Sequence, residues 1–160
     1  MKIHSEALVN IVLVEPQIPP NTGNIARLAA ATKSHLILVG ELGFELTDKY
    51  LKRAGLDYWE HVSYEHFPDR EAYFEKLAEE PGRMHLLSTK GKHAYTQSAP
   101  KPGDHYLFGK ETAGLPNEWI ERFPERCFTL PMFEPGVRSL NLGSAAAVVV
   151  YDALRQLTPF

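Results

Sequence analysis

The 160-residue sequence has one cysteine, Cys127, so it can form no intrachain disulfide and supply no cysteine-based zinc cage. Cys127 lies in an apolar run, which is typical of a buried small hydrophobe rather than a nucleophile. Long apolar runs are lacking too: stretches such as Ala145–Val150 fall far below the ~18 residues of a membrane span, and Met1–Leu8 has no signal-peptide core. We therefore expect a single cytoplasmic domain over residues 1–160, with no membrane partner.

Several catalytic motifs are also absent. The seven histidines include no His-Glu-x-x-His pair, so we expect no bound metal. Without Gly-x-Ser-x-Gly a hydrolase elbow is unsupported, and without Gly-x-Gly-x-x-Gly after the first apolar run a dinucleotide oxidoreductase is disfavoured. Gly109 and Gly114 have the spacing of the two glycines of a Walker motif. Leu115 and Pro116, however, stand where that motif requires a phosphate-binding Lys and a magnesium-binding Ser or Thr, so this loop is not a P-loop.

An excess of positive charge is missing as well. The formal net charge of −3 and the pI of about 6.2 do not indicate nucleic-acid binding, since such domains are more often basic. Small basic clusters occur at Lys49–Arg53 and Lys90–Lys92, and acidic residues gather in Glu71–Glu80. Taken alone, each cluster is explained by an ordinary solvated surface.

Short apolar runs alternate with segments long enough to hold helices. The predicted strands are Val9–Val14, Leu36–Val39, Met84–Leu87, Tyr106–Phe108 and Cys127–Leu130. The predicted helices are Thr22–Thr32, Asp48–Arg53, Asp69–Glu80, Pro116–Arg122 and Leu142–Leu157, the last with Asn141 as N-cap. This order predicts an α/β fold with a mostly parallel sheet flanked by helices.

The first of three loops rich in proline and glycine is Glu15–Asn24, between a predicted strand and a predicted helix. Its prolines stiffen the strand exit, and free amides at the helix start could hold an anion, with Arg27 one to two turns further on. Plain capping of the helix by Asn21 or Thr22 is the alternative interpretation.

The other two loops are Gly109–Pro116 and Leu130–Leu142, and each also leads from a strand into a helix. In the last loop Arg138, Ser139 and Asn141 offer a charge, a hydroxyl and an amide within one short turn. Open α/β sheets bind ligands beyond the carboxyl ends of their strands, so three loops of one kind predict a ligand site at that edge.

In this order the three loops resemble the motifs of the SPOUT superfamily of RNA methyltransferases, in its SpoU-like 2′-O-ribose branch. The matching residues are Asn21-Thr22-Gly23-Asn24 with Arg27, Phe108-Gly109-Lys110-Glu111-Thr112-Ala113-Gly114-Leu115-Pro116, and Leu130-Pro131-Met132 with Ser139-Leu140-Asn141-Leu142. The similarity runs from Val9 to Leu157. The segment Arg53–Tyr58 further resembles the short subfamily that methylates the wobble nucleotide of tRNA.

The resemblance implies a deep C-terminal trefoil knot, a rare exception to unknotted topology, with S-adenosyl-L-methionine bound in the knot of a homodimer. It implies methyl transfer to the ribose 2′-hydroxyl of the wobble nucleotide, cytidine or modified uridine, with a leucine tRNA as the expected substrate. Three alternatives stay open: an RNA-binding protein of this fold without turnover, a 2′-O-methyltransferase for another tRNA or rRNA site, and a small-molecule nucleotide binder that takes no RNA.

The resemblance also assigns roles to residues. The implied cofactor contacts are Leu87, Gly109, Leu130 and Ser139, with Met132 and Leu140 as further candidates. The implied catalytic set is Arg27, Asn21, Glu111, Ser139 and Asn141. Because a guanidinium has a pKa above ~12, we expect Arg27 to hold a phosphate and stabilise the developing alkoxide rather than act as a simple base, while the other members orient Arg27, the ribose and the loops. Two half-patches joined by dimer symmetry would reconcile tRNA binding with the acidic pI.

Overall fold

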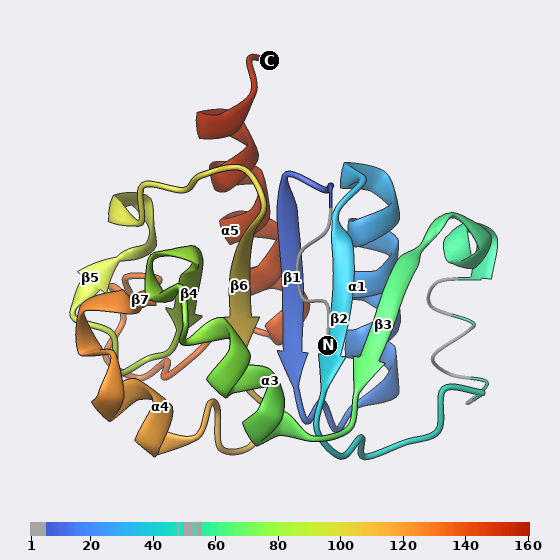
Figure 1. Cartoon of the computed structure of the whole chain (residues 1–160), viewed down its shortest axis with the longest axis horizontal. Helices are drawn as coiled ribbons and strands as arrows, with labels where there is room; N and C mark the ends of the chain where they lie inside the picture. The colour runs from blue at the N-terminus through green and yellow to red at the C-terminus, as the bar shows by residue number, and fades with distance from the viewer. Residues whose placement is uncertain (1–5, 48, 50–52, 54–55) are drawn as a thin grey trace.

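The computed structural model describes residues 6–47, 49, 53 and 56–160, and they form one seven-stranded sheet flanked by helices (Figure 1). The strand order is β3-β2-β1-β6-β4-β7-β5, and every pairing is parallel. The strands are β1 (Val9–Val14), β2 (His35–Val39), β3 (Ser63–Phe67), β4 (Met84–Leu87), β5 (His93–Ala94), β6 (Asp104–Phe108) and β7 (Cys127–Thr129). The predicted α/β class is confirmed, and the trefoil knot stays a prediction.

Helices cover both faces of the sheet. The α-helices are α1 (Pro19–Thr32), α3 (Arg70–Leu77), α4 (Asn117–Arg122) and α5 (Leu142–Leu157), and the 3-10 helices are η1 (Leu56–His61), η2 (Pro81–Arg83), η3 (Tyr95–Gln97) and η4 (Pro124–Arg126). One apolar core joins the sheet to α1 and α5, and a second joins it to α3 and α4 (Figure 1). Within the described ranges, no helix has the length and apolar character that a bilayer crossing requires.

Strand β1 shows why the central strands are apolar on both sides. Ile11 and Leu13 pack toward α1 and α5, while Val12 belongs to the core under α3 and α4. Asn10 is the polar exception in this strand, and its side-chain amide donates to the carbonyl of Gly103 at 2.9 Å. A buried amide with a partner is tolerated, so the run could be recognised as a strand covered on both faces.

The start of α1 differs from the prediction. The helix begins at Pro19 rather than Thr22, because Pro19 and Pro20 occupy the first helical positions, where no N–H is needed. The N-cap is Ile18, which makes no side-chain capping bond. The interpretation of Asn21 or Thr22 as the cap was therefore wrong, and the side chain of Asn21 is available for another role.

Other boundaries shift by a few residues. The predicted helix Asp69–Glu80 is shorter, at Arg70–Leu77, because the Asp69 carboxylate caps it by accepting from the amide of Ala72 at 3.0 Å. Helix α4 starts one residue after Pro116, and β7 ends at Thr129. By contrast, the bounds of β1, β4 and α5 are as predicted.

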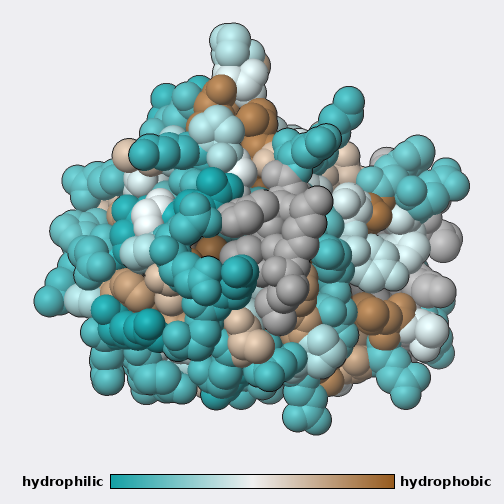
Figure 2. All heavy atoms as spheres, viewed as in Figure 1, coloured by the Kyte–Doolittle hydropathy of each residue, from teal (hydrophilic) through white to brown (hydrophobic). Residues whose placement is uncertain are grey.

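Two predictions fall where the structure is silent. Most of the helix predicted over Asp48–Arg53 and part of the Arg53–Tyr58 segment lie outside the described residues. The face seen in Figure 2 is mainly hydrophilic, with apolar atoms in small groups.

Candidate functional site

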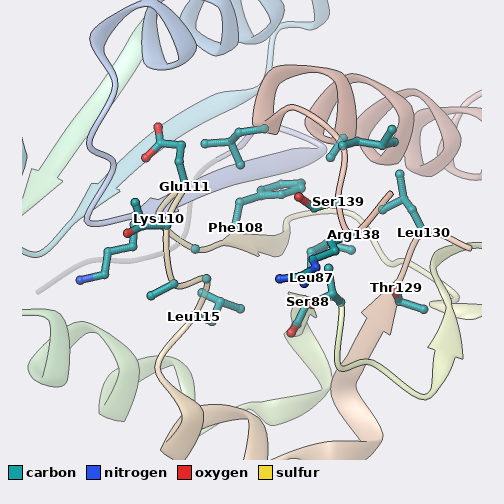
Figure 3. Close-up of a pocket in the computed structure, with 18 of the residues that line it drawn as sticks. Leu87, Ser88, Phe108, Lys110, Glu111, Leu115, Thr129, Leu130, Arg138 and Ser139 are labelled. Atoms are coloured by element: carbon teal, nitrogen blue, oxygen red, sulfur yellow. The ribbon is translucent and has the colours of Figure 1, made fainter. Parts of the chain in front are cut away.

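The three predicted loops meet around one cavity of about 600 Å³ at the carboxyl ends of β4, β6 and β7 (Figure 3). Its walls include the six predicted cofactor residues, Leu87, Gly109, Leu130, Met132, Ser139 and Leu140. Asn21, Glu111 and Asn141 of the predicted catalytic set also line it. That the six contact a cofactor stays a prediction, and all six line the same cavity.

The second loop closes on itself directly after β6. A Cβ atom built on Gly109 would lie 2.0 Å from the carbonyl carbon of Gly114 and 2.1 Å from the nitrogen of Leu115, far inside contact distance. The amide of Gly114, at φ 72°, donates to the carbonyl of Lys110 at 2.9 Å. Only glycine fits at position 109, and the resulting ring presents its backbone to the cavity.

Glu111 fastens this ring to the start of α1. One carboxylate oxygen accepts from the amide of Gln17 at 2.8 Å, and the other accepts from the amide of Ile18 at 3.2 Å and from Asn21 Nδ2 at 3.4 Å. A carboxylate at a helix N-terminus is favoured by both the free amides and the helix dipole. The prediction that these amides hold a ligand anion was therefore wrong, because the protein's own Glu111 takes that place.

A second contact reinforces the first. The side-chain carbonyl of Gln17 accepts from the hydroxyl of Thr112 at 2.7 Å and from the Thr112 amide at 3.3 Å. Gln17 thus donates to Glu111 through its amide and accepts from Thr112 through its side chain, so bonds run between the two loops in both directions. Neither Gln17 nor Thr112 was a predicted site residue, since nothing in the sequence indicates which side chains pair across the loops.

Asn141 ties in the third loop. Its Oδ1 accepts from the amides of Gly143 at 2.8 Å and Ser144 at 3.3 Å, which confirms it as the N-cap of α5. Its Nδ2 donates to Asn21 Oδ1 at 3.2 Å. Because Asn21 in turn donates to Glu111, one chain of side-chain hydrogen bonds joins all three loops.

Arg27 is exposed on α1, and the cavity wall does not include it. Ser139, in contrast, is on the wall with Asn21, Glu111 and Asn141. The structure thus brings four of the five predicted catalytic residues together, and Arg27 would have to meet a substrate outside the cavity.

Three cations also line the cavity, namely Lys90, Lys110 and Arg138. Lys90 comes from the loop after β4, and its ammonium donates to Asn117 Oδ1 at 2.5 Å. Prediction of the site overlooked this loop, although it leaves a predicted strand at the same sheet edge and that signal could have found it. Glu111 is the one acidic side chain on the described wall, and its charge is already taken up by the start of α1.

Comparison with known proteins fits this geometry. The sequence profile of the SpoU rRNA Methylase family matches residues 8–151. The chain belongs to the SpoU methylase family. A tRNA (cytidine(34)-2′-O)-methyltransferase from Burkholderia ambifaria is 47% identical over 150 residues, covering 93% of this chain and 96% of its relative.

Comparison with solved structures agrees with membership of the SpoU methylase family. One that concerns the 2-OH methylation of C/U34 on tRNA is 42% identical, superposes with a TM-score of 0.86, and is matched over 95% of this chain and 97% of its own. The SpoU methyltransferase AviRb from Streptomyces viridochromogenes, in complex with the cofactor AdoMet, is 23% identical with a TM-score of 0.79, over 95% of this chain and 58% of its own. The last likeness shows the fold alone.

Toward the amino ends of β4 and β6 this SpoU-family chain buries a polar pair. His85 Nε2 and Asp104 Oδ2 lie 2.8 Å apart, and the His85 ring stacks on Tyr106 with centroids 4.3 Å apart. Burial lowers the pKa of His85 below its ordinary value despite the hydrogen bond to Asp104. Burial also raises the pKa of the Cys127 thiol, which agrees with its prediction as a buried hydrophobe.

In the described part of the chain, no three His, Cys, Asp or Glu side chains are arranged to hold a metal ion.

Proposed function

We propose that this protein transfers the methyl group of S-adenosyl-L-methionine to the ribose 2′-hydroxyl of the wobble nucleotide of tRNA, cytidine or modified uridine, with a leucine tRNA as substrate. The observation that carries the proposal is the hydrogen-bonded chain of Glu111, Asn21 and Asn141, which joins three loops at one cavity. The 47% identity to a tRNA (cytidine(34)-2′-O)-methyltransferase along nearly the whole chain supports the same reaction.

The cavity suits the cofactor in size and chemistry. Its volume of about 600 Å³ lies within the ~300–1,000 Å³ usual for small-molecule sites. Leu87, Leu130 and Leu140 offer apolar walls for a flat base, and Gly109 lets the backbone approach a ligand closely. When bound, S-adenosyl-L-methionine supplies a sulfonium methyl group as the electrophile. Met132 and Ser139 complete the set of residues that would hold it.

The chain's own residues must position the ribose and ease the loss of its proton. In-line attack requires the 2′-oxygen to be held against the methyl group, which is the task of the loops braced by Asn21, Glu111 and Asn141. The Ser139 hydroxyl on the cavity wall orients the ribose. Arg27 holds the adjacent phosphate and stabilises the developing alkoxide, as an always-charged guanidinium can do without acting as a base.

The charge around the cavity favours RNA although the chain as a whole is acidic. Lys90, Lys110 and Arg138 lie on a wall whose acidic side chain, Glu111, is already bonded to backbone amides. Local potential, not net charge, attracts a phosphodiester backbone. This arrangement supports tRNA as the partner of a protein with a formal net charge of −3.

The proposal includes a homodimer in the cytoplasm, where tRNA is available. Support comes from α5, whose Val148 and Tyr151 are 41% and 48% exposed on one side while the other side is packed in the core. Two large apolar side chains at i, i+3 form the kind of patch that a second copy covers. Sedimentation should give a dimer that Val148→Asp dissociates, and a parent protein that sediments as a monomer would contradict this part of the proposal.

The first test is methyl transfer from labelled S-adenosyl-L-methionine to total tRNA that lacks wobble ribose methylation, followed by mapping of the modified nucleotide. Label on the wobble 2′-oxygen is the expected result. Label elsewhere in tRNA or rRNA would replace the substrate but keep the reaction. Cofactor binding without any label would favour an RNA-binding protein without turnover, and no tRNA gel shift at low salt would favour a nucleotide binder.

A second test separates the role of Arg27 from cofactor binding. Because Arg27 is exposed and outside the cavity wall, Arg27→Ala should abolish transfer and leave the dissociation constant of the cofactor nearly unchanged. Equal loss of transfer and of cofactor affinity, measured by calorimetry, would refute this division of roles.

A further inference from the structure

The three cationic side chains that line the cavity differ in their hydrogen-bond partners and in the direction in which they extend. Lys90 is bonded to Asn117 Oδ1 at 2.5 Å, and the side chain of Lys110 extends away from the cavity (Figure 3). The side chain of Arg138 instead reaches toward the middle of the cavity, where it is drawn beside Leu87 (Figure 3). Arg138 is thus the cation that a ligand entering the cavity would meet.

Nothing in the described part of the chain neutralises Arg138, whose guanidinium makes no hydrogen bond or ion pair there. The acidic side chain on the same wall, Glu111, accepts from the amides of Gln17 and Ile18. A guanidinium presents a planar fork of donors that matches a carboxylate or phosphate in two parallel bonds. Arg138 is therefore free to pair with an anionic group of a ligand that enters the cavity.

The backbone on both sides of Arg138 is held in place. Before it, a turn is closed by the amides of Gly136 and Val137, which donate to the side chain and the carbonyl of Glu134 at 3.0 Å each. After it, Asn141 caps α5 and bonds to the first loop. A cation carried on a segment fixed at both ends loses less freedom when it binds an anion.

We propose that Arg138 binds the carboxylate of the methionine moiety of S-adenosyl-L-methionine, which rests on the proposed function of the same cavity. The carboxylate is the one anionic group of the cofactor, while its amine and sulfonium are positive. Arg138 attracts the first and repels the other two, and so determines which way the amino-acid end lies. The product S-adenosylhomocysteine has the same carboxylate and is held in the same way.

The test compares two ligands that differ in this carboxylate only: S-adenosylhomocysteine and its decarboxylated analogue. Calorimetry on Arg138→Gln should show S-adenosylhomocysteine bound about tenfold or more weakly, as expected for loss of a charge-assisted pair. Binding of the decarboxylated analogue should change less than about twofold. Arg138→Lys, which keeps the charge but not the fork, should fall between the parent and Arg138→Gln.

Lys92→Gln is the matched control, because it removes one exposed positive charge from outside the cavity wall and should leave both affinities unchanged. Equal weakening of both ligands by Arg138→Gln would overturn the inference, as would unchanged binding of S-adenosylhomocysteine together with weaker, salt-dependent tRNA binding. A parent protein that binds neither ligand would refute the proposed function itself. Thermal unfolding of Arg138→Gln should match the parent, because the exposed side chain has no bond to lose among the described residues.

Discussion

Replacing Glu111 with glutamine tests whether this residue holds the loops together or acts directly on the substrate. The two backbone bonds to its carboxylate, at 2.8 and 3.2 Å, lie at a partly exposed helix start. Bonds to a charged group contribute roughly 1.5–3 kcal/mol each when buried, and solvent exposure reduces this sum to about 1–2 kcal/mol. Glutamine keeps one acceptor but turns an N–H toward the other amide, so most of that stability is lost.

At roughly 2–4 °C per kcal/mol for a chain of this size, Glu111→Gln should lower the melting temperature by about 2–8 °C. Methyl transfer should fall about 10- to 100-fold, because Asn21 loses the group that holds it and small misplacements of a reacting centre are costly. Calorimetric unfolding and single-turnover transfer measure the two effects, with Glu121→Gln on the exposed side of α4 as the charge control. Unchanged stability together with lost transfer would show that Glu111 acts directly on the substrate.

Two further predictions follow from packing and burial. Gly109→Ala should eliminate cofactor binding measured by calorimetry, because its Cβ would overlap Gly114 at 2.0 Å; retained affinity would mean that the ring can open. Burial lowers the pKa of His85 below its ordinary value of 6.5. Below that pH the unfolded chain therefore binds a proton at His85 more readily than the folded chain does. The contribution of His85 to the free energy of unfolding is full above pH 6.5 and falls as the pH decreases. Urea unfolding between about pH 7.5 and 5.5 should show this slope, and His85→Gln should flatten it; an equal slope in both proteins would refute the assignment.

The sheet could be predicted where strands are buried on both faces and missed where they are not. β1 and β4 are apolar runs and were placed correctly. β3 is an edge strand with the sequence SYEHF, mostly exposed, so it has no apolar run to recognise. β5 has two residues at the opposite edge, too few for any periodicity. In both cases strand formation depends on the neighbouring strand rather than on local sequence.

The candidate site was predicted as three loops, and the structure confirms that they meet. What sequence could not give is the pairing of groups across the loops. Glu111 neutralises the start of α1, a contact between residues 94 positions apart that no local pattern indicates. For the same reason the prediction of a free-anion site at that helix was wrong, and Lys90, which was explained as part of a solvated basic cluster, was not placed at the site. Residue types could be predicted locally, whereas their partners depend on the folded topology.

The hydrogen bond between Asn141 and Asn21 spans 120 positions, and β6, which carries the second loop, pairs with both β1 and β4. The cavity therefore has no complete wall until α5 has docked against the sheet, which places its assembly late in folding. On the proposed function, a ribosome-bound chain that has not yet released residue 141 could not hold S-adenosyl-L-methionine in this cavity, because Asn141 and α5 would be missing from its wall.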